Sequence, residues 1–136
     1  MDIFKRNLAP ISDEAWNEID ERAEQVINSQ LTTRQSLKVN GPKGLSYTAV
    51  PTGRLNILDN KSSNVKLGMY DNKSLVETRI TFELSRWELD NLLRGAKDIE
   101  LDALEDAAKE IARFEDDVIY NGNKNSKIQG LMEAAS

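Results

Sequence analysis

The stretch ITFELSRWELDNLLRG, residues 80–95, decides how this chain folds, because a strand-like pattern changes there into a capped helix. Residues 80–84 alternate apolar and polar side chains, which is the period of a half-buried strand. Ser85 and Glu88 form a capping box, in which a hydroxyl and a carboxylate bond the first unpaired N–H groups of a helix. Gly95 stands where a left-handed residue is needed to end that helix. We therefore predict a strand that runs directly into a helix.

A longer helix is predicted upstream. Ser12 is placed as an N-cap, and the acidic residues after it complement the positive end of the helix dipole. Ile11 and Trp16 occupy the two positions of a hydrophobic staple. Apolar residues then recur at steps of three and four, namely Trp16, Ile19, Ala23, Val26, Ile27 and Leu31. This spacing predicts one amphipathic helix over about residues 13–31.

The segment between these two helices has the period of strands. Apolar residues alternate in three runs, Leu45, Tyr47 and Ala49, then Leu55 and Ile57, then Val65, Leu67 and Met69. The six polar residues 59–64 suit a hairpin tip, residues 71–74 suit a second turn, and the glycines and proline of 41–44 mark a bend before the first strand. We therefore predict a β-hairpin with sparse apolar side chains.

A lone hairpin of this kind is marginal in water. It gains stability by packing against another chain or by folding back on its own domain, and periodicity alone leaves these two alternatives open.

A third helix is predicted from Asp102 to the residue before Gly122. Asp102 and Glu105 form a variant capping signal, and Gly122 ends the helix. Its broad apolar face consists of Leu104, Ala107, Ala108, Ile111, Ala112, Phe114, Val118 and Ile119. Its carboxylates suggest a solvated acidic face, with Lys109 and Arg113 as partners four residues away. A di-iron site is not predicted, because that chemistry usually pairs Glu with His three residues on.

Composition excludes several classes of protein. The 136 residues suit one domain, and 18 basic against 23 acidic side chains give a net charge of −5, which argues against a nucleic-acid module. The sequence contains no Cys and no His, so disulfides, thiolate nucleophiles, imidazole catalysis and Cys/His zinc sites are excluded. No segment suits a signal peptide or a membrane span. We expect a cytoplasmic protein that is not an enzyme and holds no metal.

Three segments of the chain resemble the encapsulins, bacterial and archaeal shell proteins also known as linocin-like bacteriocins. They are MDIFKRNLAPISDEAWNEID at residues 1–20, WELDNLLRG at 87–95 and ARFEDDVIYNG at 112–122. They occur in the family's order and at approximately its spacing, and the resemblance covers the whole chain. It implies an α+β, phage-capsid-like fold of the Hong Kong 97 type.

On this resemblance, residues 1–36 are the N-terminal arm and helix, and 37–84 are an extended loop whose β-hairpin pairs with a neighbouring subunit. Residues 85–136 are the first part of the peripheral domain, with its spine helix. Encapsulins are roughly twice this length, so their axial domain is missing here. We therefore expect a second chain to carry the C-terminal half, in a split or nicked protein, or else a truncation, and we expect this half not to make a normal shell alone.

The resemblance implies a structural shell subunit of a nanocompartment. Such subunits self-assemble into an icosahedral, virus-like protein cage that encloses a cargo enzyme, either a ferritin-like iron-storage protein or a peroxidase. Cargo carries a short targeting peptide, for which Ile27, Leu31 and Arg34 are the candidate binding residues. Three alternatives remain open: a phage or prophage capsid protein, which encloses DNA, a bacteriocin-like secreted effector, and a soluble adaptor domain that never assembles.

The resemblance also suggests a cofactor. Some encapsulins bind a flavin, possible here as FMN, by ring stacking at the residue that matches Trp87, and Arg79 would approach its phosphate because guanidinium matches phosphate geometry. The alternative is structural, with Trp87 anchoring its helix to the extended arm.

Overall fold

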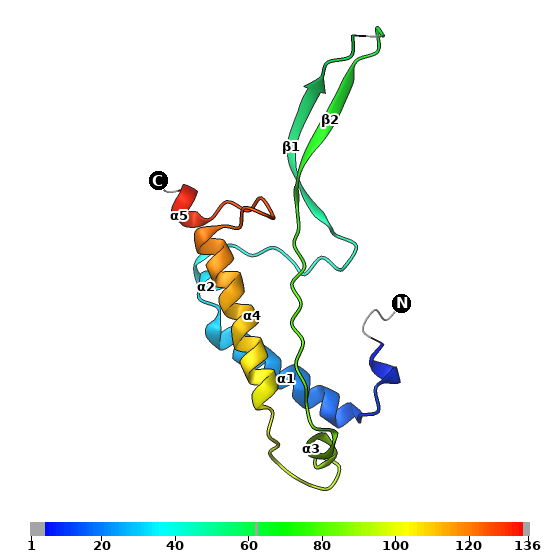
Figure 1. The fold of residues 1–136 in the computed structure, drawn as a ribbon, viewed down its shortest axis with the longest axis vertical. Coiled ribbons are helices and arrows are strands. Elements are labelled where there is room, and N and C mark those ends of the chain that lie inside the picture. Colours follow the sequence, from blue (N-terminus) through cyan, green and yellow to red (C-terminus); the bar gives the residue numbers. More distant parts are fainter. Residues whose placement is uncertain (1–4, 62, 135–136) are drawn as a thin grey trace.

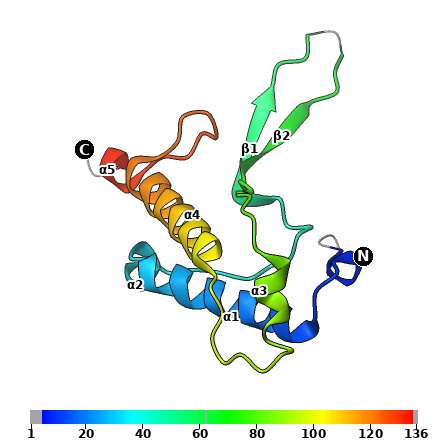
Figure 2. The same ribbon diagram turned by 60° about the horizontal axis from the view of Figure 1, so that its bottom comes forward.

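The computed structural model describes residues 5–61 and 63–134. Two long helices, α1 (Asp13–Gln30) and α4 (Asp102–Asn121), pack against each other, and a long β-hairpin extends away from them (Figures 1 and 2). The hairpin consists of β1 (Ala49–Leu58) and β2 (Leu67–Ser74). The remaining elements are short: a 3-10 turn at Arg6–Leu8, α2 (Thr33–Ser36), α3 (Arg86–Asp90) and α5 (Leu131–Ala134). We call α1 to α4 without the hairpin the helical body.

The predicted first helix is confirmed to within one residue. The Ser12 hydroxyl accepts a hydrogen bond from the Ala15 N–H at 3.1 Å, as expected of an N-cap. At the other end, Leu31 stands just beyond the last helical residue and still donates its N–H to the Ile27 carbonyl. The local signals of capping and apolar spacing were therefore sufficient to define this helix.

The hydrophobic core lies where α1, α3 and the start of α4 meet. Leu101 is its most enclosed large residue, with 1% of its surface exposed. The cluster of buried residues is Ala15, Ile19, Leu89, Ile99, Leu101 and Leu104, with Ile11, Trp16, Ala23, Leu84 and Leu92 packed against it. Both residues of the predicted hydrophobic staple thus contribute to the core.

The two strands of the hairpin pair only with each other among the described residues. They are antiparallel, with Ala49 opposite Ser74 and Leu58 opposite Leu67, and the register shifts between Pro51 and Leu55. The predicted tip at 59–64 lies between the strands, although Ser62 falls outside the described residues.

The turn predicted at 71–74 is wrong, because β2 continues through these residues to Ser74. Polar residues are compatible with a strand when a neighbour supplies the hydrogen bonds, and β1 does so. The Thr52 hydroxyl also donates to the Asp71 carboxylate at 2.8 Å across the pair. Of the alternating run predicted to start at Leu45, only Ala49 belongs to a strand.

The segment 75–85 is extended but forms no strand in the described structure, which corrects the prediction for 80–84. An alternating sequence becomes a strand only when a neighbouring strand satisfies its backbone groups. No such neighbour is present among the described residues. Leu84 packs against the core, whereas Phe82 remains exposed. The segment therefore connects the hairpin to α3 as an open edge.

Of the two hydrogen bonds of the capping box predicted at the start of α3, the one to the Ser85 hydroxyl is confirmed. Ser85 Oγ accepts from the Glu88 N–H at 3.4 Å, whereas the Glu88 carboxylate accepts from the Asn91 side chain instead of completing the box. After α3 the chain continues as turns that end at Gly95, whose φ of +102° is the left-handed region. The Ala96 N–H bonds the Asn91 carbonyl in the manner of a Schellman motif, so Gly95 ends this run of turns, whereas the helix itself ends earlier than predicted, at Asp90.

Helix α4 begins and ends where predicted, but its cap differs. Asp102 is the first helical residue rather than the cap, and its N–H donates to the Glu100 carboxylate. Glu100 therefore satisfies one unpaired N–H group at the helix start. At the other end, Gly122 has a φ of +75° and ends the helix as expected.

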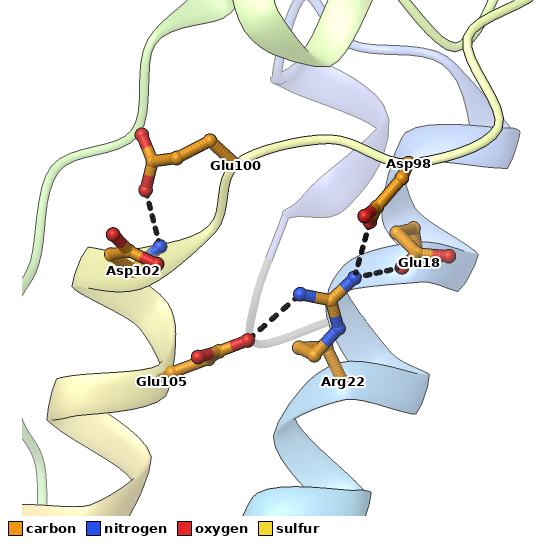
Figure 3. Close-up of polar contacts among 6 residues, drawn as sticks. All are labelled: Glu18, Arg22, Asp98, Glu100, Asp102 and Glu105. Carbon is orange, nitrogen blue, oxygen red and sulfur yellow. Dashed lines mark hydrogen bonds and ion pairs between the residues drawn. The ribbon is translucent and has the colours of Figure 1, made fainter.

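Helices α1 and α4 are also joined by an ionic cluster around Arg22 (Figure 3). Its guanidinium contacts Glu18 and Glu105 at 2.8 Å each and Asp98 at 3.5 Å. The hydrogen bond from Arg22 to Glu105 raises the pKa of the arginine further, so it stays charged. The prediction that Lys109 and Arg113 pair with the acidic face of α4 is wrong within the described residues, where Glu105 and Glu115 pair instead with Arg22 and Arg34.

Candidate functional site

The hairpin presents an unusual amount of apolar surface to solvent. Ile57 is 74% exposed and Tyr70 79% exposed, although both lie within paired strands. Residues directly opposite in the ladder share a face, so the Leu55–Tyr70 pair lies on one face and the Leu58–Leu67 pair on the other. Its exposed large apolar residues are Val50, Leu55, Ile57, Leu58, Leu67, Met69 and Tyr70. Among the described residues, each strand of the hairpin makes its main contacts with the other strand rather than with the helical body.

A second apolar surface lies between the extended segment and α4. A groove of about 430 Å³ is lined by Ser74, Leu75, Val76 and Thr78, by the last turns of α4 and by the loop 123–128. Phe114 and Val118 supply much of its apolar wall. It adjoins a cavity of about 400 Å³ between residues 76–80 and α4, and Phe114 borders both. The open edge of the extended segment therefore runs beside a largely apolar groove.

Asp116 on α4 holds the turn between α1 and α2. Its carboxylate accepts from both the N–H and the hydroxyl of Thr32 at 3.1 Å, and from the buried Thr33 hydroxyl at 2.8 Å. Desolvation raises the pKa of Asp116, but the combined hydrogen bonds from Thr33 and Thr32 outweigh it and lower the pKa below the ordinary aspartate value. Thr33 is only 2% exposed, so this contact is sheltered.

The three residues predicted to bind a cargo peptide are placed in different environments. Leu31 is 3% exposed, so little of it is accessible. Arg34 forms a two-point ion pair with Glu115, at 3.0 and 2.7 Å. The hydrogen bond from Glu115 raises the pKa of Arg34. Ile27 is half-buried and is the only one of the three with accessible apolar surface.

Trp87 is 78% exposed, so the described structure does not show it anchoring its helix to the extended arm. The contact found at its ring is with the Arg94 guanidinium, 5.9 Å from the ring centroid. A cavity of about 320 Å³ beside it is lined by Trp87, Arg94, Arg86 and Asp90. The cavity thus combines an aromatic face with two guanidinium groups and one carboxylate.

Arg79 is not brought to Trp87 by any contact in the structure. It donates to Glu77 at 2.7 Å and lines the cavity against α4 rather than the one beside Trp87. Arg94 is thus the cation that the structure places at the tryptophan, and the sequence analysis missed it. The available signal was the spacing of seven residues between Trp87 and Arg94, which is about two helical turns and would place both on one face of a continuous helix.

The sequence analysis also missed a contact that fastens the N-terminal arm. The Arg6 guanidinium donates to both carboxylate oxygens of Asp20 at 2.7 and 2.8 Å and stacks 4.6 Å from the centroid of the Trp16 ring. The hydrogen bond from Arg6 lowers the pKa of Asp20. Beside this contact is an open cavity of about 740 Å³, lined by Arg6, Trp16, Ile11 and neighbouring residues. No local motif links residues fourteen positions apart, so this pairing required the fold.

Two further properties concern the described residues only. No group of three His, Cys, Asp or Glu side chains is arranged there to hold a metal ion. None of the helices in this part of the chain is long and apolar enough to cross a membrane.

Comparison with known proteins identifies relatives along the whole chain. Residues 1–136 match the family described as "encapsulating protein for peroxidase". The chain is 36% identical over all its length to a type 1 encapsulin shell protein of Mycolicibacterium paratuberculosis, covering 51% of that protein. It is 34% identical over 96% of its length to the corresponding protein of Rhodococcus erythropolis, and 31% identical over its full length to that of Brevibacterium linens.

The chain thus spans about half the length of the curated relatives it matches. The resemblance that rested on three short segments extends over every residue of the chain. On this basis the chain belongs to the linocin-type family of encapsulating proteins, the encapsulins.

Proposed function

We propose that the chain forms part of the wall of an encapsulin nanocompartment, as a structural subunit that self-assembles and does not itself catalyse a reaction. The hairpin carries this proposal. It exposes apolar side chains on both faces and makes no sheet with its own helical body, so burial against neighbouring subunits supplies the missing stabilisation. The relatives are named as shell proteins, which supports the same function.

The arrangement of elements supports a Hong Kong 97-type capsid fold. In that interpretation the N-terminal arm precedes α1, the hairpin is the extended intersubunit loop and α4 is the spine helix. The open edge at 75–84 and the adjoining apolar groove would be covered by protein in the assembled wall.

Association through the hairpin can be tested with the purified chain. We expect analytical ultracentrifugation to show oligomers whose fraction rises with concentration, and electron microscopy to show their shape. Ile57→Lys should shift the chain to monomers, because a charge replaces an exposed apolar contact. Asn56→Lys is the matched control, since it adds the same charge one residue away without removing apolar surface. A chain that is monomeric at every concentration, or two variants that behave alike, would contradict the role of the hairpin.

The enclosed cargo is proposed to be a peroxidase, because the matching family is described as an encapsulating protein for peroxidase. A ferritin-like iron-storage cargo is the other possibility raised by the sequence. A targeting peptide could use the accessible surface of Ile27, whereas Arg34 is already ion-paired with Glu115. Binding of a fluorescent peptide from a candidate cargo, compared between the native chain and Ile27→Ala, tests this site.

Flavin binding is proposed at Trp87, where the exposed ring would stack on the isoalloxazine and Arg94 would meet the phosphate. FMN added to the purified chain should quench tryptophan fluorescence in a saturable way. Trp87→Ala should abolish the saturable part, and Arg94→Gln should weaken binding more than Arg79→Gln. A chain that shows no saturable change with FMN would exclude the site.

A further inference from the structure

The sequence contains two Asn-Gly pairs, Asn40-Gly41 and Asn121-Gly122, which the fold places in different environments. Asn followed by Gly is chemically the least hindered pair for attack of a backbone nitrogen on an asparagine side chain, because glycine has no Cβ to obstruct it. The reaction still needs a free N–H at the following residue and a backbone that can bend. The two sites can therefore be compared by their hydrogen bonds and mobility.

Asn40 and Gly41 meet both requirements. They lie exposed in the irregular segment between α2 and β1, and neither the Asn40 side chain nor the Gly41 N–H has a hydrogen-bond partner among the described residues. The space around Gly41 is open, since a Cβ built there would approach nothing closer than the Lys43 backbone nitrogen at 3.6 Å. The attacking nitrogen is thus available to the Asn40 side chain.

Asn121 and Gly122 are held by the end of α4. The Gly122 N–H donates to the Val118 carbonyl at 2.7 Å, and the Asn121 side-chain amide donates to Asp117 at 2.8 Å. Gly122 is also enclosed, because a Cβ there would meet the Ile128 carbonyl oxygen at 2.6 Å. Reaction at Asn121 therefore requires the helix end to open first.

We propose that Asn40 is a site of spontaneous deamidation in the folded chain, and that the fold protects Asn121. The Gly41 nitrogen attacks the side-chain carbonyl carbon of Asn40, a C–N bond forms to close a cyclic imide, and ammonia leaves with the displaced proton. Water then adds to one of the two imide carbonyls and opens the ring. The products are aspartate or isoaspartate at position 40.

Deamidation at this position adds a negative charge, and its isoaspartate product also lengthens the main chain by one atom. The new carboxylate forms at the edge of a cavity of about 310 Å³ that Asn40 lines together with Lys43, whose ammonium lies 5.6 Å from the Tyr47 ring centroid. Isoaspartate in addition inserts a methylene into the main chain of the connection that leads to the hairpin. The modification thus accumulates with age at the link between the helical body and the hairpin.

Mass spectrometry of the aged chain tests this proposal. The native chain is incubated at mildly alkaline pH, and samples are digested with trypsin, which separates the sites into peptides 39–43 and 114–124. We expect deamidation of 39–43 to proceed at least about tenfold faster than at Asn121, since each 1.4 kcal/mol needed to open the helix end slows the reaction by about that factor. In denaturant the two rates should converge.

Two variants test which asparagine is responsible for the deamidation seen in each peptide. Asn40→Gln, which retains an exposed amide, should abolish the change in peptide 39–43 and leave peptide 114–124 unaffected. Asp117→Ala, which removes the side-chain bond to Asn121, should accelerate deamidation there. Equal rates at the two sites in the native chain, faster reaction at Asn121, or a native ratio that persists in denaturant would each overturn the proposal.

Discussion

The helical body and the hairpin are stabilised in opposite ways. The body buries apolar residues between α1, α3 and α4 and adds polar contacts that join residues more than 80 positions apart, such as Arg22 with Glu105. The hairpin has backbone pairing over two strands and little burial, with Ile57 and Tyr70 largely exposed. The body is therefore stabilised by burial and long-range contacts, whereas within the described residues the hairpin relies mainly on the pairing of its own two strands.

Leu101→Ala should destabilise the helical body more than the other substitutions below, and much more than a change in the hairpin. The side chain is 1% exposed at the junction of α1, α3 and α4, so its removal leaves a cavity and should lower the free energy of unfolding by about 2–5 kcal/mol. Chemical denaturation followed by circular dichroism at helical wavelengths measures this loss. Leu55→Ala, in the hairpin, is the matched control and should lower the free energy of unfolding far less. Similar losses in both variants would mean that the hairpin is part of the same cooperative core.

Arg22→Ala should have the next largest effect, because it leaves Glu18 and Glu105 without their shared cation between α1 and α4. The arginine side chain is 21% exposed, so the loss should be about 1–2 kcal/mol after allowance for solvent screening. Thermal unfolding at low and high salt measures it. Arg34→Ala breaks a more exposed pair and should cost about 0.5 kcal/mol. A larger loss for Arg34→Ala would reverse this ranking of the two contacts.

The sequence predicted the parts of the body whose causes are local. Ser12 and Gly122 cap or end their helices as expected, because capping depends on residues within one turn. The apolar spacing defined α1 and α4 for the same reason. The tip of the hairpin followed from its run of polar residues.

Long-range partners could not be predicted. Residues 80–84 alternate like a strand but have no strand beside them in the described structure, and no local pattern reveals whether a neighbour exists. The acidic face of α4 was assigned to Lys109 and Arg113, whereas the fold brings Arg22 and Arg34 to it. Of the candidate site, Trp87 was identified, but its cation partner Arg94 was not.

Asp116→Asn should have a smaller effect that depends on pH. The contact with Thr32 and Thr33 lowers the pKa of Asp116, so its contribution is fully present above the unfolded pKa of about 4 and is lost as pH falls through the lower folded value. At neutral pH the variant should lose about 1 kcal/mol, by analogy with removal of a helix cap. As the pH falls below about 4, the native chain should lose stability more steeply than the variant.

Denaturation midpoints measured across this pH range give the comparison. Asp106→Asn removes the same charge from the exposed face of α4 without touching the two threonines, and serves as the control. If Asp116→Asn and Asp106→Asn have the same pH profile, the threonine contacts do not stabilise the carboxylate.

Ile57→Ser should change the stability of the body least of all. The side chain is 74% exposed, so its replacement should alter the free energy of unfolding of the helices by no more than about 0.5 kcal/mol. Leu104→Ser makes a comparable change at a buried position of α4 and should be strongly destabilising. Hydrogen exchange should become faster in β1 and β2 of the Ile57 variant while the amides of α1 and α4 keep their protection.

Association of the chain should weaken in the same variant, because the apolar surface removed from the hairpin is the surface available to a neighbour. Unchanged association together with a destabilised body would show that the hairpin supports its own chain rather than the contact between chains.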